Sequence, residues 1–379
     1  MSQFHERYGL TPIINACGKM THLGAAAVPP EVTSRVMEAM SEFIDMPEFL
    51  KVASEAIADA TGAEAGTVTH CAAAGITVTC AGAMTGDDLG NVLSLPDTTG
   101  LKNEVIIQKG HAVNFGAPVT QMIRMTGATA VEFGETNRAL PEHMARAINT
   151  NTAAAIFVLS HHTVQHNQLS FAEFVAIADA HGVPVIVDGA AEAFLARELL
   201  EAGASAVVFS DQKHLNGFTA GVVAGNRDLI DATARQAMGL GRAMKPTKEG
   251  IVSVIATMEW LRTFDRDAYF ADMDAKSDPV VEAMSKIPGI TAISEPDITG
   301  NPQARAKIIV DPAVTGTTAE KVCDALKAGT PCIHPRAHHV DEGFFYIDPV
   351  ELRLSEVPTV IARLEEIFQS ARIPVGAQV

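Results

Sequence analysis

The chain has few cysteines, few basic residues and no long apolar run. Its five cysteines are scattered and form no CxxC pair, which excludes a disulfide framework and the commonest zinc and redox motifs. We expect reduced thiols, mostly buried, at Cys17, Cys71, Cys80, Cys323 and Cys332.

No stretch of the sequence approaches the roughly 18 apolar residues of a membrane helix. The N-terminal residues are polar and lack the apolar core of a secretion signal. These two absences predict a cytoplasmic protein that does not bind membranes.

Lysine and arginine together number 28, against 45 aspartates and glutamates, and the formal net charge is −17. Such a charge repels a polyanion, and no clear basic stripe offsets it. We therefore expect no nucleic-acid partner, and a small molecule as the ligand.

What the chain does have is a globular composition, with 47% hydrophobic and 19% charged residues among 379. This length suits one large domain and a smaller one. Between about residues 49 and 209, strand-like and helix-like segments alternate, which predicts an α/β fold with a mostly parallel sheet covered by helices on both faces. The expected strands are 66–72, 104–108, 128–132, 153–159, 183–187 and 206–209.

Local signals refine this pattern. Ser170 and Glu173 form a capping-box pattern that begins a helix, and Gly182 ends it. The short apolar segment 221–225 follows the preceding strand too closely for a helical crossover, so it should lie antiparallel to its neighbour.

Beyond residue 241 the rhythm changes to that of a smaller α+β domain. We expect an N-terminal segment, 1–30, that packs on this small domain, a large domain at 31–250 and the small domain at 251–379. The expected elements here are helices at 248–262, 317–328 and 358–369, and strands at 289–293, 306–310, near 332 and at 344–347.

Two residues suggest the chemistry. Lys213 lies in the segment 210–217 that directly follows the apolar strand 206–209, and Asp188 ends the upstream apolar strand 183–187. Either residue alone is commonly a loop or turn residue. Together, on an α/β frame, they supply a lysine for an aldehyde and a carboxylate for a pyridinium nitrogen, the two groups that pyridoxal 5'-phosphate requires.

Three further features are compatible with this cofactor. The small residues of 72–77 join a predicted strand to a predicted helix and let backbone N–H groups approach a phosphate, although tight helix packing uses the same residue types. Ser210 either donates its hydroxyl to that phosphate or caps a turn. His111, after another predicted strand, either stacks on the pyridine ring or is a bystander.

These segments occur in an order that resembles a known family. The segments are 15–18, 61–65, 72–77, 187–192, 210–213 and 241–249. The chain is similar, from about residue 8 to 368, to the selenocysteine-synthase-like branch of fold type I pyridoxal phosphate enzymes, whose large domain is aspartate-aminotransferase-like. Within that branch it is most similar to the ammonia-lyases of D-glucosaminate 6-phosphate.

The resemblance implies roles for individual positions around the cofactor. Lys213 matches the lysine that forms the Schiff base, and Asp188 matches the partner of the pyridine nitrogen. The segment with Arg242 and Lys245 can cross a dimer interface in this superfamily, which implies a homodimer or a higher even-numbered oligomer. Ala74, Gly75 and Ser210 match phosphate contacts, and Ile76, His111 and Lys245 complete the expected cofactor-binding set.

The resemblance also implies a substrate site, with one departure. Arg336 or Arg353 would bind a substrate carboxylate, because a guanidinium matches its two oxygens, and Arg242 and His334 are further candidates. The histidines at 334, 338 and 339 could recognise a phosphate or a sugar acid, or form a hydrated surface cluster, and no metal site is expected. Asp211 and Gln212 stand where the pattern has small residues, which leaves the exact substrate open.

The expected function is an α,β-eliminating lyase acting on a hydroxylated, possibly sugar-derived amino acid, such as D-glucosaminate or its 6-phosphate. The products would be a 2-keto-3-deoxy acid and ammonia. An amino-acid racemase or epimerase is the first alternative, because it begins with the same proton removal at Cα. A selenium transferase on seryl-tRNA is disfavoured by the acidic charge and by the absence of an N-terminal RNA-binding extension. A non-catalytic cofactor-binding protein is disfavoured by Lys213 and Asp188.

Overall fold

The computed structural model describes residues 3–299 and 303–371, in two compact units. One unit is Val28–Phe264, and the other combines Met1–Ala27 with Asp265–Val379. The boundary expected near residue 250 falls inside helix α11 (Lys248–Leu261), which packs on α2 (Pro30–Met40) and α3 (Met46–Thr61).

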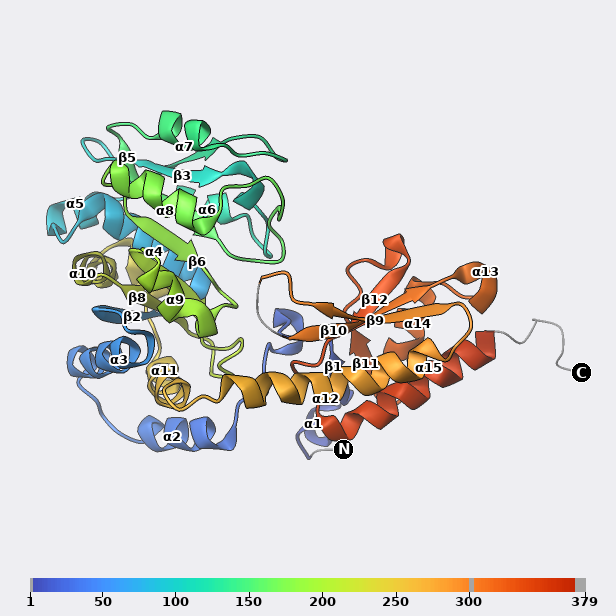
Figure 1. The fold of residues 1–379 in the computed structure, drawn as a ribbon. Coiled ribbons are helices and arrows are strands. Elements are labelled where there is room, and N and C mark those ends of the chain that lie inside the picture. The colour runs from blue at the N-terminus through green and yellow to red at the C-terminus, as the bar shows by residue number, and fades with distance from the viewer. Residues whose placement is uncertain (1–2, 300–302, 372–379) are drawn as a thin grey trace, which may run out of the picture. The chain divides into compact units, whose positions relative to one another are not determined.

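The unit Val28–Phe264 is built on a seven-stranded sheet of order β2-β8-β7-β6-β5-β3-β4 (Figure 1). Strand β8 is antiparallel to both of its neighbours, and all other pairs are parallel. The mostly parallel sheet and the antiparallel segment 221–225 are therefore confirmed. The strands are β2 (Ala65–Thr69), β3 (Glu104–Gln108), β4 (Thr129–Phe133), β5 (Thr152–Val158), β6 (Val185–Asp188), β7 (Ala206–Ser210) and β8 (Gly221–Gly225).

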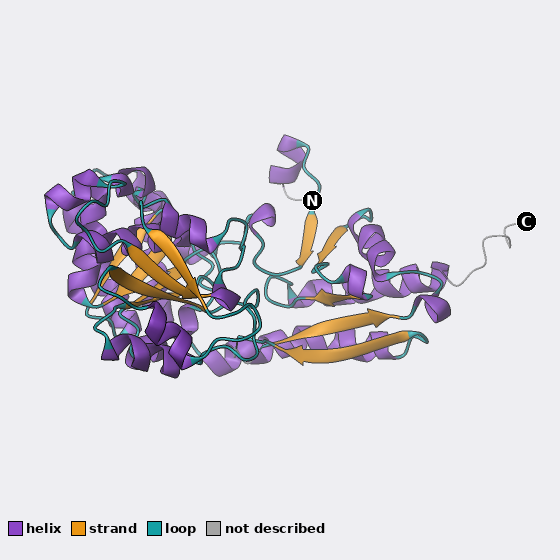
Figure 2. Cartoon of the chain, turned by 90° about the horizontal axis from the view of Figure 1, so that it is seen from above, coloured by secondary structure: helices purple, strands orange, loops and turns teal. Residues whose placement is uncertain are grey.

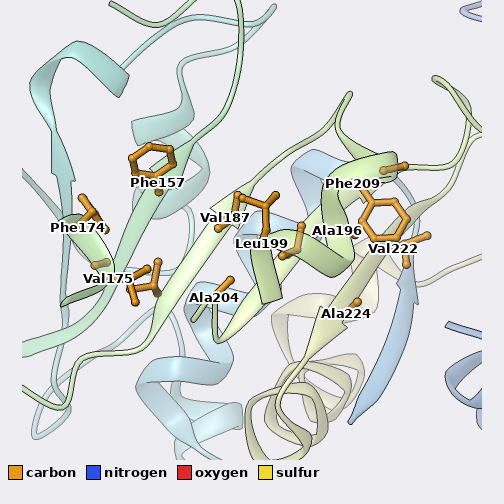
Figure 3. Close-up of a cluster of buried hydrophobic side chains, with 14 of the residues drawn as sticks. Phe157, Phe174, Val175, Val187, Ala196, Leu199, Ala204, Phe209, Val222 and Ala224 are labelled. Atoms are coloured by element: carbon orange, nitrogen blue, oxygen red, sulfur yellow. The ribbon is translucent and has the colours of Figure 1, made fainter. Parts of the chain in front are cut away.

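Helices cover both faces of this sheet (Figure 2), because its central strands are apolar on both sides. Successive residues of β6 enter opposite cores: Val185 and Val187 lie in one, shown in Figure 3, and Ile186 lies in the other. The first core is closed by α3, α8 (Phe171–Ala180), α9 (Ala196–Glu201) and α11, and the second by α4 (Ala72–Thr85), α6 (Val119–Arg124) and α10 (Arg227–Arg235).

One predicted helix start agrees with the structure and another boundary does not. The capping box of Ser170 and Glu173 begins α8 as expected. Strand β2 ends at Thr69, however, and Ala72 already belongs to α4. The expected strand 66–72 was three residues too long, because consecutive alanines favour a helix. The segment 72–77 is thus the beginning of the helix itself.

The second unit is α+β, as expected for the C-terminal part. It contains an antiparallel sheet of order β12-β10-β9 and a parallel pair, β1-β11. Strand β1 (Ile13–Ala16) was not expected, because its partner β11 (Cys332–Pro335) is remote in the sequence. The other elements include α12 (Arg266–Ser285), β9 (Ile290–Pro296), β10 (Ala304–Val310), α14 (Ala319–Lys327), β12 (Phe344–Ile347) and α15 (Val357–Ala371).

Within the described ranges, none of the helices combines the length and the apolarity that crossing a membrane demands.

Phe174 tests the core between α8 and the sheet. Its side chain is completely buried, and its ring centroid lies 5.4 Å from that of Phe157 (Figure 3). We expect Phe174→Ala to lower the free energy of unfolding by about 3–5 kcal/mol, because it leaves a cavity. The matched control is Phe43→Ala, whose ring is fully exposed and whose loss should cost less than about 0.5 kcal/mol. Denaturant titration measures both, and equal effects would contradict the packing.

Candidate active site

Polar side chains gather at the carboxyl edge of the seven-stranded sheet. Asp188 is the last residue of β6 and Ser210 the last residue of β7, and these two parallel strands are neighbours. Asp188 pairs in register with Val208 on one side and with Val158 of β5 on the other. In open α/β sheets this edge is where ligands bind.

Lys213 lies in the loop that follows β7, and Asp188 is close enough to influence it. Burial lowers the pKa of the Lys213 amine, while the charges of Asp188 and Glu192 raise it. Burial raises the pKa of Asp188 to about 6, while the charge of Lys213 and the backbone N–H of Ala190 lower it. An amine with a lowered pKa is more readily the neutral nucleophile that attacks an aldehyde.

The beginning of α4 lies against the same edge. Gly221 pairs with both Thr69 and Ser210, and a Cβ added to it would lie 2.3 Å from the backbone carbon of Cys71, the N-cap of α4. A Cβ added to Gly75 would lie 2.7 Å from Cγ1 of Val208. The helix therefore approaches the strand ends at a distance that only glycine permits.

This close approach fits a phosphate site. The N-terminus of a helix presents free backbone N–H groups to an anion, and α4 has no side-chain cap at Cys71 to occupy them. Ala74, Gly75, Ile76 and Ser210 are buried, and the N–H of Gly75 donates to the carbonyl of Cys71 at 3.0 Å, so the N–H groups that the helix leaves free precede Gly75. The residues present fit the phosphate of pyridoxal phosphate, and the contacts themselves stay a prediction.

His111 lies after β3 and is buried. Its Nδ1 accepts a hydrogen bond from the backbone N–H of Val158, 3.0 Å away, the residue that pairs with Asp188. Burial lowers the pKa of His111 to about 3, so the ring is neutral near pH 7. Its centroid lies 4.6 Å from that of Phe157, edge to face. The hydrogen bond fixes the ring beside the strand that neighbours Asp188, and stacking on a cofactor stays a prediction.

Arg242 and Lys245 belong to the exposed segment between α10 and α11. The carbonyl of Met244 accepts a hydrogen bond of 3.0 Å from the backbone N–H of His70, which follows the end of β2. This bond holds the segment near the carboxyl edge. Whether both side chains reach a ligand or a neighbouring subunit stays a prediction.

The arginines of the second unit differ in their surroundings. Arg305 is held by two carboxylates, Asp348 and Asp297, each at 2.7 Å. Arg336 is the residue after β11, and its partly buried side chain lies 3.6 Å from the carboxylate of Asp348. Among the described residues, the contacts of Arg305 with Asp348 and Asp297 are shorter than that of Arg336 with Asp348, so Arg336 is the less tightly paired guanidinium.

Arg353 and His334 are the other candidates in this unit. The side chain of Arg353 is 74% exposed and lies 3.7 Å from Glu356, which makes it the less constrained guanidinium. His334 is in β11, opposite Asn15 of β1, and its ring centroid is 6.3 Å from that of His22. His339 bonds to Glu342 at 2.8 Å. Arg336 and His334 are two residues apart at the end of β11, and their contact with a substrate stays a prediction.

Two buried acidic residues, Glu192 and Asp211, have surroundings that the sequence did not indicate. Glu192 is buried and its charge reaches Lys213. Asp211 does not lie toward the beginning of α4: its carboxylate is buried against α11, where it accepts hydrogen bonds from Ser253 and Thr257. No sequence signal could have shown this, because those hydroxyls belong to a helix more remote in the chain.

In the part of the chain that the structure describes, no three His, Cys, Asp or Glu side chains are grouped so that they could hold a metal ion.

A family model described as L-seryl-tRNA selenium transferase matches residues 13–270. The chain belongs to this family. A D-glucosaminate-6-phosphate ammonia lyase of Salmonella typhimurium is 37% identical over 97% of this chain and 98% of its own. A 5'-C-glycyluridine monooxygenase-decarboxylase of a Streptomyces species is 33% identical over 96% of this chain and 92% of its own.

Transferases that carry the family's name are more distant. The L-seryl-tRNA(Sec) selenium transferase of Moorella thermoacetica is 27% identical over 70% of this chain, which corresponds to 59% of its own length. The expected similarity to the selenium transferase family and its ammonia-lyases is thus confirmed.

Solved structures agree with the expected fold class. The structure of D-glucosaminate-6-phosphate ammonia-lyase matches with a TM-score of 0.87 and 37% identity, over 98% of this chain and 99% of the other. A structure of SPT with PLP matches with a TM-score of 0.62 and 14% identity, over 95% of this chain and 88% of the other. The fold is fold type I, with a mostly parallel large domain and a C-terminal α+β domain.

The buried carboxyl of Asp211 should make stability depend on pH. Its pKa is raised by burial to about 7, against an ordinary value of 3.8. A raised pKa stabilises the folded state fully below the ordinary value, and this contribution is lost as the pH rises through about 7. Relative to Asp211→Asn, which does not titrate, the wild-type free energy of unfolding should fall by a few kcal/mol between about pH 4 and about pH 7.5.

Denaturant titrations of both proteins across this range measure the difference. The contribution of Asp188, whose pKa is raised to about 6, is common to both proteins and cancels. A difference that does not change with pH would show that Asp211 titrates as an exposed carboxyl.

Proposed function

We propose that this protein is a pyridoxal phosphate-dependent α,β-eliminating lyase. Its substrate would be a hydroxylated amino acid derived from a sugar, such as D-glucosaminate or its 6-phosphate, and its products a 2-keto-3-deoxy acid and ammonia. The observation that carries the proposal is the pair of Lys213 and Asp188 at the carboxyl edge, each shifting the pKa of the other. The end-to-end similarity to an ammonia lyase supports the choice of reaction.

When bound, the cofactor supplies an electron sink that makes the Cα proton of an amino acid removable. Lys213 would hold its aldehyde, and Asp188 would hold the proton on its ring nitrogen, since a buried carboxylate stabilises a neighbouring positive charge. The beginning of α4, with Ala74, Gly75 and Ile76, and the hydroxyl of Ser210 would bind its phosphate. His111 would lie on its ring and Lys245 would add a positive charge.

With the substrate held by the cofactor in its place, the amine of Lys213 would be available as a base. Burial lowers the pKa of this amine, which favours the neutral form that accepts a proton from Cα. Overall, the Cα proton and the Cβ hydroxyl would leave as one water molecule, and another water would hydrolyse the released unsaturated amine to ammonia and the keto acid. Glu192 is a buried carboxyl whose charge keeps the protonated lysine favourable after the transfer.

For the substrate we propose Arg336 as the carboxylate ligand, with Arg242 and His334 as further contacts and Arg353 as the weaker candidate. The support for Arg336 is its partly buried guanidinium, whose ionic contact with Asp348 is long, at 3.6 Å. A carboxylate can form a bidentate bond with such a guanidinium, whereas an exposed arginine would first have to give up its hydrogen bonds to water.

The transferase reaction of the family's name is not proposed for this chain. The transferase from Moorella thermoacetica matches this chain over 59% of its own length, whereas the ammonia lyase matches over 98%. The net charge of −17 also opposes binding of tRNA. We further propose a cytoplasmic enzyme that works as a homodimer or a higher even-numbered oligomer on a small-molecule substrate.

Removal of Lys213 tests the reaction. We expect Lys213→Ala to reduce ammonia and keto-acid formation from D-glucosaminate 6-phosphate by at least about a thousand-fold, because both the aldehyde ligand and the base are lost. The matched control is Lys286→Ala, a surface lysine paired with Glu282, which should keep full activity. Undiminished turnover by Lys213→Ala would refute the assignment. Exchange of the Cα proton for solvent deuterium without ammonia release would identify a racemase instead.

The arginine assignment has its own test. We expect Arg336→Gln to raise KM about 10-fold to 100-fold with a smaller change in kcat, because a charged bidentate bond made in the ground state is lost. Arg353→Gln is the matched control and should change KM less than about two-fold. Steady-state kinetics on both variants decide between them, and a larger effect at Arg353 would reverse the assignment.

A further inference from the structure

The loop that carries Lys213 is closed on itself at Asp211. The backbone N–H of Asp211 donates to the carbonyl of Ala220 at 3.0 Å, and the carbonyl of Asp211 accepts from the N–H of Gly217 at 2.8 Å. Inside the loop, the N–H of Asn216 donates to the carbonyl of Lys213 at 3.0 Å. Asn216 also has a positive φ of 56°, which reverses the chain direction. Lys213 is thus at the middle of a short turn whose two ends meet at Asp211.

The side chain of Asp211 fastens this turn to α11. Its Oδ2 accepts a hydrogen bond of 2.6 Å from the hydroxyl of Ser253, and its Oδ1 accepts one of 2.5 Å from the hydroxyl of Thr257. The two hydroxyls are four residues apart on one face of the helix. Asp211 and Ser253 have no exposed surface and Thr257 has 1%, so water does not compete for these bonds.

Ser253 connects both ends of the turn. Besides donating to Asp211, its Oγ accepts the backbone N–H of Phe218 at 2.7 Å. Gly217 fits so tightly that a Cβ added to it would lie 1.9 Å from Oδ2 of Asp211. The turn is therefore packed directly onto the carboxyl group, and no larger residue could occupy position 217 without displacing it.

We infer that Asp211 is a positioning residue for Lys213: by binding Ser253 and Thr257, it fixes the lysine turn on α11 and holds the amine at the carboxyl edge of the sheet. This inference rests on the proposed role of Lys213. It also accounts for the acidic residue that stands two positions before the lysine, where the related pattern has a small residue.

Asp211 acts through these hydrogen bonds and not through its charge on the lysine. The charges that raise the pKa of Lys213 are those of Asp188 and Glu192. The carboxyl of Asp211 is directed to the helix side of the turn, where the groups in contact with it are hydroxyls and backbone. Loosening the turn would therefore expose Lys213 to water without removing a charge partner.

The test uses Thr257→Val, Ser253→Ala, Asp211→Ala and Asp211→Asn. Thr233→Val is the matched control, because Thr233 is also a buried helical threonine, whose hydroxyl bonds to the carbonyl of Leu229 at 2.6 Å. Two experiments are made on each full-length protein. The first gives kcat and KM of the holoenzyme. The second gives the pH midpoint of Lys213 acetylation by acetic anhydride after removal of the cofactor, followed by mass spectrometry. Thermal midpoints verify folding.

We expect Asp211→Ala and Thr257→Val to lower kcat about ten-fold or more with KM changed less than about two-fold, since small displacements of a reacting group cost rate. The Lys213 acetylation midpoint should rise toward that of an ordinary lysine, because the amine gains solvent. In Asp211→Asn the amide oxygen can still accept a hydrogen bond from a hydroxyl, so this variant should be closer to wild type than Asp211→Ala. Thr233→Val should match wild type in both experiments.

The outcomes separate this inference from the proposed function. If Thr257→Val and the Asp211 variants keep the kcat and the acetylation midpoint of Thr233→Val, Asp211 does not position Lys213. If wild type releases no ammonia but the variants still raise the midpoint, the lyase assignment fails while the inference holds. Should Asp211→Ala fail to fold, Thr257→Val, which replaces one hydroxyl by a methyl group, gives the same decision.

Discussion

The central physical constraint in this structure is a lysine amine held partly away from water beside carboxylates. Burial lowers the pKa of Lys213 while Asp188 and Glu192 raise it, so its proton affinity is set by the distances at which the fold holds them. A flexible surface lysine cannot be tuned in this way, because water screens its neighbours. The parallel sheet solves the problem geometrically, since adjacent strands deliver Asp188 and the lysine turn to the same edge.

Around Lys213 and Asp188, neighbouring backbone segments approach one another closely. Gly75 and Gly221 let the beginning of α4 reach the strand ends, and Gly217 lets the lysine turn close on Asp211. Each of these glycines stands where a side chain would collide with a named neighbour, so their role is steric. The start of α4 is rich in alanine, which forms a helix with little side-chain bulk around its first backbone N–H groups.

In the second unit, the carboxylate of Asp348 is shared unevenly between two arginines. The chain carries a net charge of −17, so carboxylates are available to neutralise most guanidinium groups. In the cluster around Asp348, the short ionic bonds go to Arg305, and Arg336 is left at a longer distance. A partly buried cation that is incompletely paired costs free energy, which an anionic partner would lower.

The sequence by itself determined the strands of the large sheet, the antiparallel β8 and the capping box at Ser170. It also placed Asp188 at the end of one apolar strand and Lys213 shortly after the next, because apolar periodicity and capping residues act over a few neighbouring positions. The strand predicted at β2 was too long, and β1 was not predicted, because its pairing partner is remote in the chain. Only the tertiary structure decided that Asp211 bonds to Ser253 and Thr257, that His111 bonds to Val158, and that Arg336 and Arg353 differ in burial. These contacts join residues far apart in the sequence, so no local pattern encodes them, and they exist only once the chain has folded.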